Sequence, residues 1–213
     1  VYIHIGFLVV QRELGTGLLF LLIYLILLYV FDTNIKFLFI NLGIALLGGL
    51  AGFNFIHHLQ VRLVAWLNPW ADIAGKGYQI TQSLFAIGAG GFFGTGIGLG
   101  QPEYIPEVST DFIFSAICEE LGIFGGVAVV LLYFILVYRG IKITLIVKDL
   151  FHKAVALGIS VMFGLQSFII IGGVIKLIPL TGITLPYISY GGSSLTASFV
   201  ALGILQAVSI KAV

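Results

Sequence analysis

Long apolar stretches, separated by short polar segments, dominate this chain. Five of them approach or exceed the length of about 20 mostly apolar residues that a helix needs to cross a bilayer. They are residues 15–31, 37–56, 112–138, 155–175 and 194–210, and the apolar run 1–10 is too short to cross alone. The pattern therefore predicts an all-α fold, a polytopic transmembrane helix bundle with about five full spans and a partial one. No repeat or linker divides the chain, so residues 1–213 are expected to form a single membrane domain.

The composition agrees with a protein whose solvent is lipid. Hydrophobic residues make up 60% of the chain and charged residues 9%, with a mean hydropathy of +1.16, and this leaves too little polar surface for a soluble globule. The net charge of +1 gives no indication of nucleic-acid binding. The single cysteine, Cys118, excludes an intrachain disulfide and argues against a cysteine metal site. Because the chain starts at Val1 inside an apolar run, we interpret it as a fragment of a longer protein.

The distribution of basic residues predicts the orientation. Segment 139–153 carries four Lys and Arg residues against one Asp, and such segments accumulate on the cytoplasmic side. Counting spans from there places segments 57–111 and 177–192 outside and the C-terminus in the cytoplasm.

The outer segment 57–111 is much longer than the other connections. Long connections are usually functional or disordered, and its tryptophans and phenylalanines favour packing on the membrane interface over disorder. We expect a short amphipathic or re-entrant helix at 79–93. Irregular backbone at membrane depth is tolerated where it lines a wet cavity, so a cavity at the outer face is predicted.

Asp111 stands where this outer segment enters the third span. It could cap the helix, together with Ser109 and Thr110. It could instead be a general base whose pKa is adjusted by partial burial. Its position alone does not separate the two interpretations.

Two more acidic residues, Glu119 and Glu120, follow about 12 to 14 Å further along the helix. Ionisable residues inside a bilayer are candidates for function. The alternative is a structural polar network between helices, with Lys176 or Arg12 as the partner.

Three further features allow a functional and a structural interpretation. Gly191, Gly192, Ser193 and Ser194 could cap the last helix or bind an anion at its N-terminus. Arg62 could anchor at the membrane interface or hold a phosphate. The glycines of 88–100 follow no strand and precede no Lys-Ser/Thr pair, so tight packing or a bend is preferred to a nucleotide loop.

Four motifs occur in order along the chain: LNPWADIAGKGYQITQS, AIGAGGFFGTGIGLG, IPEVSTDFIFSAICEELG and TGITLPYISYGGSS. Their order and spacing resemble the SEDS proteins, the FtsW/RodA/SpoVE family of bacterial cell-wall synthesis. The resemblance covers nearly all of this chain but only about the C-terminal half of a typical ten-span member.

The resemblance implies a peptidoglycan glycosyltransferase that polymerises lipid II at the outer face of the bacterial cytoplasmic (inner) membrane. Its implied partners are lipid II, membrane lipid and a class B penicillin-binding protein, in elongation, division or sporulation. Asp111 matches the essential aspartate of the family's TDFIF motif, which favours the catalytic interpretation. Arg62 and the amides near Ser193 are then candidates for binding the diphosphate. No cofactor or metal ligand set is predicted, and a divalent cation at the diphosphate is left open.

Three positions depart from the family pattern. Glu13 keeps a carboxylate in QRELG where Gln-Pro-Asp-Leu-Gly is usual, but Arg12 replaces the proline. Ser109 stands where histidine is frequent, and Thr181 where many division-type members carry lysine, which favours the elongation or sporulation branches. A lipid II flippase and a non-catalytic scaffold for a penicillin-binding protein are the alternative functions, and the fragment alone is expected to be inactive.

Overall fold

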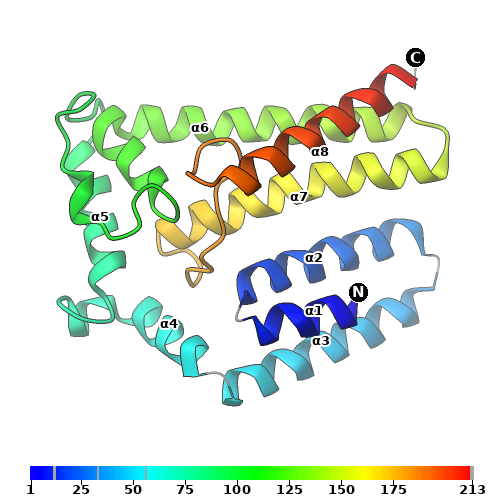
Figure 1. Cartoon of the computed structure of the whole chain (residues 1–213), viewed down its shortest axis with the longest axis horizontal. Helices are drawn as coiled ribbons and strands as arrows, with labels where there is room; N and C mark the ends of the chain where they lie inside the picture. Colours follow the sequence, from blue (N-terminus) through cyan, green and yellow to red (C-terminus); the bar gives the residue numbers. More distant parts are fainter. Residues whose placement is uncertain (12, 33, 56, 212–213) are drawn as a thin grey trace. The chain divides into compact units, whose positions relative to one another are not determined.

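The computed structural model describes residues 1–11, 13–32, 34–55 and 57–211, without the side chains of 50, 51, 53–55, 57 and 58, and these residues contain helices but no strand (Figure 1). The α-helices are α1 (Tyr2–Val10), α2 (Leu14–Phe31), α3 (Ile35–Phe55), α4 (His57–Leu67), α5 (Tyr78–Gly90), α6 (Ile113–Ile146), α7 (Leu150–Val174) and α8 (Gly192–Lys211). Two short 3-10 helices, η1 (Pro69–Asp72) and η2 (Pro102–Tyr104), lie in the expected outer segment. The prediction of an all-α membrane protein is confirmed.

Four of these helices are long and apolar enough to cross a membrane: α2, α6, α7 and α8. They correspond to four of the five expected spans. The fifth, 37–56, falls on α3, in which the apolar part found among the described residues is the shorter Ile35–Gly49.

The segment expected as a cytoplasmic loop, 139–153, is mostly helical. Helix α6 continues to Ile146 and α7 begins at Leu150, so only three residues connect them. Arg139 and Lys142 lie within the extended helix, because Arg and Lys are good helix formers and need no loop to reach water.

Contacts divide the chain into two compact units. Unit 1 comprises Val1–His57, Ile135–Leu165 and Thr196–Val213, and unit 2 comprises His58–Phe134 and Gln166–Leu195. The expectation of a single membrane domain stays a prediction.

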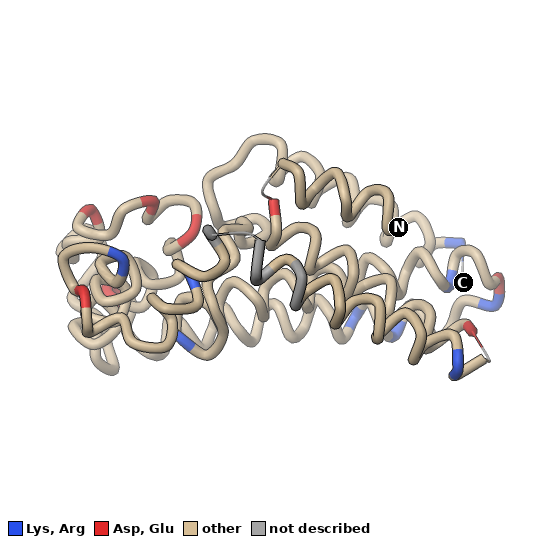
Figure 2. The backbone as a smooth tube through the Cα atoms, turned by 90° about the horizontal axis from the view of Figure 1, so that it is seen from below, with Lys and Arg blue, Asp and Glu red and all other residues tan. Residues whose placement is uncertain are grey.

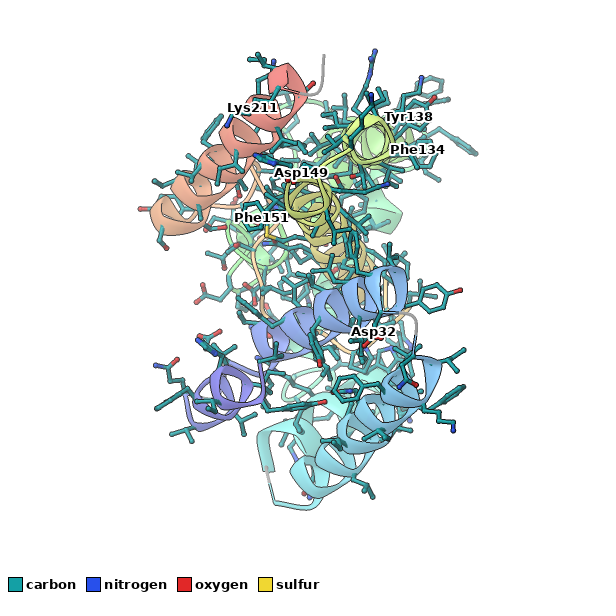
Figure 3. All side chains as sticks on the ribbon, turned by 90° about the vertical axis from the view of Figure 1, so that its right-hand side faces the viewer. Asp32, Phe134, Tyr138, Asp149, Phe151 and Lys211 are labelled. Atoms are coloured by element: carbon teal, nitrogen blue, oxygen red, sulfur yellow. The ribbon has the colours of Figure 1, made fainter. Side chains whose placement is uncertain are left out.

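Unit 1 is built from simple helix packing. Helices α1, α2 and α3 lie side by side (Figure 1), and the Tyr2 and Tyr24 hydroxyls both donate to Oδ1 of Asn41, at 2.5 and 3.2 Å. A second cluster buries Val147, Ala156, Leu205 and Val208. Tyr138, labelled in Figure 3, lies beneath Lys142, whose Nζ is 5.1 Å from the ring centroid.

Several described basic residues of unit 1 lie in the last turns of α6, in the α6–α7 connection and in the last turn of α8. Figure 2 shows them near the α6–α7 connection and the C-terminal end of α8. Asp149 in that connection accepts a hydrogen bond from the His152 backbone N–H at 2.9 Å. The sidedness of this end is still a prediction.

Unit 2 contains a broken helix and a loop that fits the break. Helix α6 is interrupted at Gly122 (φ 68°, ψ −169°). Loop 91–96 forms backbone hydrogen bonds to the turns on both sides of the break. The N–H groups of Thr95 and Gly96 donate to the carbonyls of Glu119 and Glu120 at 2.9 and 3.1 Å, respectively. The Ile123 N–H donates to the Gly91 carbonyl at 2.9 Å.

Two glycines of this region allow the close approach. A Cβ at Gly94 (φ 82°) would lie 2.1 Å from the Glu120 carbonyl oxygen, and one at Gly90 would lie 1.9 Å from that of Cys118. Tight packing, the preferred interpretation of the glycine-rich motif, is confirmed at these two positions. The short helix expected at 79–93 is α5.

Candidate functional site

The candidate site lies in unit 2, in the turn that leads into α6. The amide of Asp111 donates to the Glu107 carbonyl at 3.0 Å, which closes the turn. Phe112 and Phe114, on either side of Ile113, are buried at 0% and 5% exposure. The buried phenylalanines fix the backbone of the TDFIF motif, while Asp111 itself remains half-buried.

Arg62, from α4, reaches the same place. Its Nη1 donates to the carbonyl of Thr181 at 2.8 Å and more weakly to that of Leu180 at 3.5 Å. A guanidinium has five N–H donors, so these two bonds leave Nη2 and Nε for other acceptors.

Gly182 lies between Arg62 and Asp111. Its φ of 72° is in the left-handed region that favours glycine. A Cβ there would be 3.2 Å from Nη2 of Arg62 and 3.4 Å from Oδ2 of Asp111. A side chain at this position would contact both charged groups, so the glycine keeps the space between them clear.

The surroundings of Asp111 raise the pKa of its carboxyl group. Burial is the largest cause, and the negative charge of Glu107 adds to it. The Thr110 hydroxyl and the positive charge of Arg62 act in the opposite direction without cancelling the increase. A carboxylate with a raised pKa is a stronger base, as proton abstraction at neutral pH requires.

Segment 185–190 holds the Asp111 turn in place. Ser189 Oγ donates to the Thr110 carbonyl at 2.5 Å and accepts from the Leu185 amide at 2.8 Å. The Tyr190 amide donates to the Ser109 carbonyl at 2.8 Å. Sequence reasoning missed Ser189 and Gly182, although both belong to the quoted TGITLPYISYGGSS motif.

The glycine-serine segment that follows begins the last helix. Helix α8 starts at Gly192, with Gly191 just before it, and the Ser194 hydroxyl bonds Thr184 Oγ1 at 2.7 Å. Ser193 is exposed. Within the described residues no hydrogen bond joins Ser193 or Ser194 to Arg62 or Asp111, so the anion-binding role of this segment stays a prediction.

Glu119 and Glu120 lie just before the break in α6, and both accept hydrogen bonds from the neighbouring loop through their backbone carbonyls. Glu119 is buried, and its Oε1 accepts a hydrogen bond from the Gln101 amide at 2.9 Å, while its buried Oε2 has no hydrogen-bond partner among the described residues. The backbone carbonyl of Lys176 accepts a hydrogen bond from Trp66 Nε1 at 3.1 Å. In the described part of the chain no ion pair joins Lys176 to Glu119 or Glu120, and Arg12 lies outside the described residues.

Glu13 belongs to unit 1, where it precedes α2 and accepts a weak bond from Thr16 Oγ1 at 3.4 Å. Among the residues with described positions, no three His, Cys, Asp or Glu side chains gather as a metal site. The divalent cation stays an open expectation.

The chain matches known proteins along its length. The model of the FtsW/RodA/SpoVE family, described as a cell cycle protein, matches residues 1–212. The peptidoglycan glycosyltransferase RodA of Mycobacterium bovis is 43% identical over 97% of this chain and 44% of its own length. Stage V sporulation protein E of Bacillus subtilis is 45% identical over 93% of this chain and 55% of its own length.

A division-type relative and a solved structure extend the match. The probable peptidoglycan glycosyltransferase FtsW of a Geobacter species is 36% identical over 98% of this chain and 58% of its own length. A chain from a study of how a peptidoglycan synthase complex coordinates polymerization and crosslinking superposes with a TM-score of 0.76, at 28% identity, over 98% of this chain and 59% of that chain. This chain thus spans about half the length of the curated relatives it matches. It belongs to the FtsW/RodA/SpoVE family.

Proposed function

We propose that the full-length protein is a peptidoglycan glycosyltransferase that polymerises lipid II, with Asp111 as its catalytic base. One observation carries the assignment of the residue: a half-buried carboxylate with a raised pKa faces an arginine across Gly182. The names of the relatives supply the reaction class.

In this reaction a sugar hydroxyl of one substrate attacks the anomeric carbon of the other. The bond from that carbon to the diphosphate breaks, and a glycosidic bond forms. Asp111 accepts the hydroxyl proton, and Nη2 of Arg62, the nitrogen nearer to Gly182, donates to the departing diphosphate. Donors aimed at developing negative charge are among the largest contributions to catalysis.

The proposal also covers partner and location. The structural neighbour comes from a peptidoglycan synthase complex, which supports a class B penicillin-binding protein as partner. The protein would span the bacterial cytoplasmic membrane several times, with segment 57–111 outside and the basic segment 139–153 and the C-terminus in the cytoplasm.

Thr181 supports the elongation or sporulation branches over division. Its carbonyl holds Arg62, and it replaces the lysine of many division-type members.

A lipid II flippase is the second candidate, and a scaffold for the penicillin-binding protein is the third. A transporter needs a continuous polar path through its spans. In unit 2 the ionisable pair Arg62 and Asp111 lies instead at the N-terminal end of α6, outside the span, which favours polymerisation there.

The test uses the full-length protein with its partner and labelled lipid II. Asp111→Asn keeps the shape of the side chain and removes the base, so glycan synthesis should fall by a factor of about 10² to 10⁴. Glu103→Gln, an exposed carboxylate of the same loop, is the matched control and should keep wild-type activity. Equal rates for Asp111→Asn and wild type would contradict the assignment, and lipid II transport without glycan synthesis would favour the flippase.

A further inference from the structure

Loop 91–99 exposes large apolar side chains without a single charge. Its sequence is GFFGTGIGL, and the exposed fractions are 68% for Phe92, 85% for Phe93, 81% for Ile97 and 75% for Leu99. Contiguous exposed apolar patches of this kind mark surfaces that contact a partner or a membrane.

The loop is held against a membrane-spanning helix. Its backbone bonds to the turns of α6 around Gly122 fix its position within unit 2. The Phe93 ring lies 5.5 Å from the ring of Phe124, which is itself 59% exposed on α6. The apolar surface of the loop therefore continues directly into the lipid-facing surface of the span.

The length of α6 gives the depth of the loop. The part of α6 after the break at Gly122, residues 123–146, corresponds to about 36 Å of helix, a little more than the hydrocarbon thickness of about 30 Å. Arg139 and Lys142 mark one limit of the hydrocarbon, because charged groups inside it are costly. Counting back about 20 residues reaches Glu119 and Glu120. The turns that bind loop 91–96 thus lie at the opposite edge of the bilayer core.

We propose that loop 91–99 inserts its apolar side chains into the outer leaflet, at the boundary between headgroups and acyl chains. Phe and Leu side chains of interfacial segments are buried at this boundary. Lipid is the expected occupant because the apolar surface of the loop is continuous with Phe124 on the membrane-spanning helix. The Glu119–Gln101 hydrogen bond and the backbone bonds at Thr95 and Gly96 keep the inserted loop in register with α6.

Insertion would set the height of the candidate site. Asp111 lies in the turn before α6, eleven residues ahead of the break to which the loop is bonded, so the depth of the loop also sets the depth of the Asp111 turn. This consequence rests on the proposed function, whereas the insertion itself does not.

The insertion is tested by the depth of a nitroxide label. Phe93→Cys is labelled in the full-length protein, in a cysteine-free background that includes Cys118→Ala, and reconstituted in phosphatidylglycerol nanodiscs. We expect relaxation by oxygen to exceed relaxation by a water-soluble nickel chelate. A label at Glu103→Cys, in the same outer segment, should show the reverse. Nickel-dominated relaxation at position 93 would overturn the proposal. So would protection that appears only after the penicillin-binding protein is added, since the occupant would then be protein.

A double variant tests the functional consequence. Phe92→Ser with Phe93→Ser should reduce lipid II polymerisation several-fold in bilayers and leave it unchanged in detergent, with unaltered thermal unfolding. Equal loss in both media would contradict a role for insertion. An inserted label at position 93, together with no polymerisation by the unlabelled wild-type protein, would refute the proposed function alone.

Discussion

The two units of the molecule use hydrogen bonds in different ways. Among the described residues of unit 1 most side-chain bonds join positions two to four apart, such as Thr144 to Gly140 and Ser160 to Ala156, and Tyr2 and Tyr24 bond Asn41 across helices. In unit 2 side-chain bonds join distant segments: Arg62 to Thr181 is 119 residues apart, and Ser189 to Thr110 is 79. Unit 1 is thus organised by helix packing, whereas unit 2 is organised by polar contacts between distant segments, some of which hold the Asp111 turn.

This difference predicts where substitutions should be costly. A buried polar group that loses its partner is penalised more than an exposed one, so unit 2 should be the sensitive part.

Removal of the Arg62 charge should have the largest effect. Arg62→Gln deletes the donors proposed for the diphosphate and the charge beside Asp111, and lipid II polymerisation should fall by a factor of about 10² to 10³. Lys142→Gln, the loss of an exposed cation in unit 1, is the matched control and should leave the rate within two-fold of wild type. Comparable losses in both variants would remove the distinction between the units.

A methyl group at Gly90 should destabilise the protein. Its Cβ would lie 1.9 Å from the Cys118 carbonyl, and such overpacking costs about 1–3 kcal/mol or more. Gly88→Ala, in the same helix with nothing within 4 Å of the new Cβ, should be neutral or slightly stabilising, because alanine is the better helix former. Thermal unfolding in detergent measures both, and equal stability of the two variants would contradict the close packing of α5 on α6.

Loss of the Ser189 hydroxyl should have a moderate effect. Ser189→Ala leaves the Thr110 carbonyl and the Leu185 amide without their partner, at a cost of about 1–3 kcal/mol. It should also lower polymerisation, because these bonds position the Asp111 turn.

The matching substitution in unit 1 is Asp149→Asn, which should reduce the free energy of unfolding by less than Ser189→Ala does. Hydrogen bonds from His152 lower the pKa of Asp149, so this aspartate stabilises the fold above its ordinary pKa, and the contribution is lost as pH falls through the lowered value. A greater loss of stability in Asp149→Asn than in Ser189→Ala, measured by thermal unfolding at neutral pH, would contradict the expectation that unit 2 is the more sensitive part.

The two units also differ in how far the sequence predicts them. Hydropathy located α2, α6, α7 and α8 to within about eight residues, because a lipid-facing helix needs only an apolar run. It failed at the end of α6, where basic residues continue a helix that was expected to end near Tyr138.

Unit 2 was predicted through its motifs and not through periodicity. The TDFIF motif identified Asp111, and the glycine-rich motif suggested a tight bend, which the backbone bonds around Gly122 explain. The pairing of Arg62 with the Thr181 carbonyl and the position of Gly182 between two charges could not be predicted, since contacts across more than a hundred residues leave no local pattern. The bond from Trp66 Nε1 to the Lys176 carbonyl, 110 residues away, could not be predicted for the same reason, and the expected partnership of the Lys176 side chain stays a prediction.

The pH profile of kcat/KM for lipid II polymerisation tests the central claim most directly. The rate needs the Asp111 carboxylate, so it should fall as pH drops through a pKa above the ordinary value of 3.8. Glu107→Gln removes a negative charge and should shift this limb to lower pH. Arg62→Gln removes a positive charge that lowers the pKa of Asp111, so the acid limb of the activity that remains in this variant should shift to higher pH. Opposite shifts in the two variants are the predicted result, and an acid limb that stays in place in both would contradict Asp111 as the catalytic base.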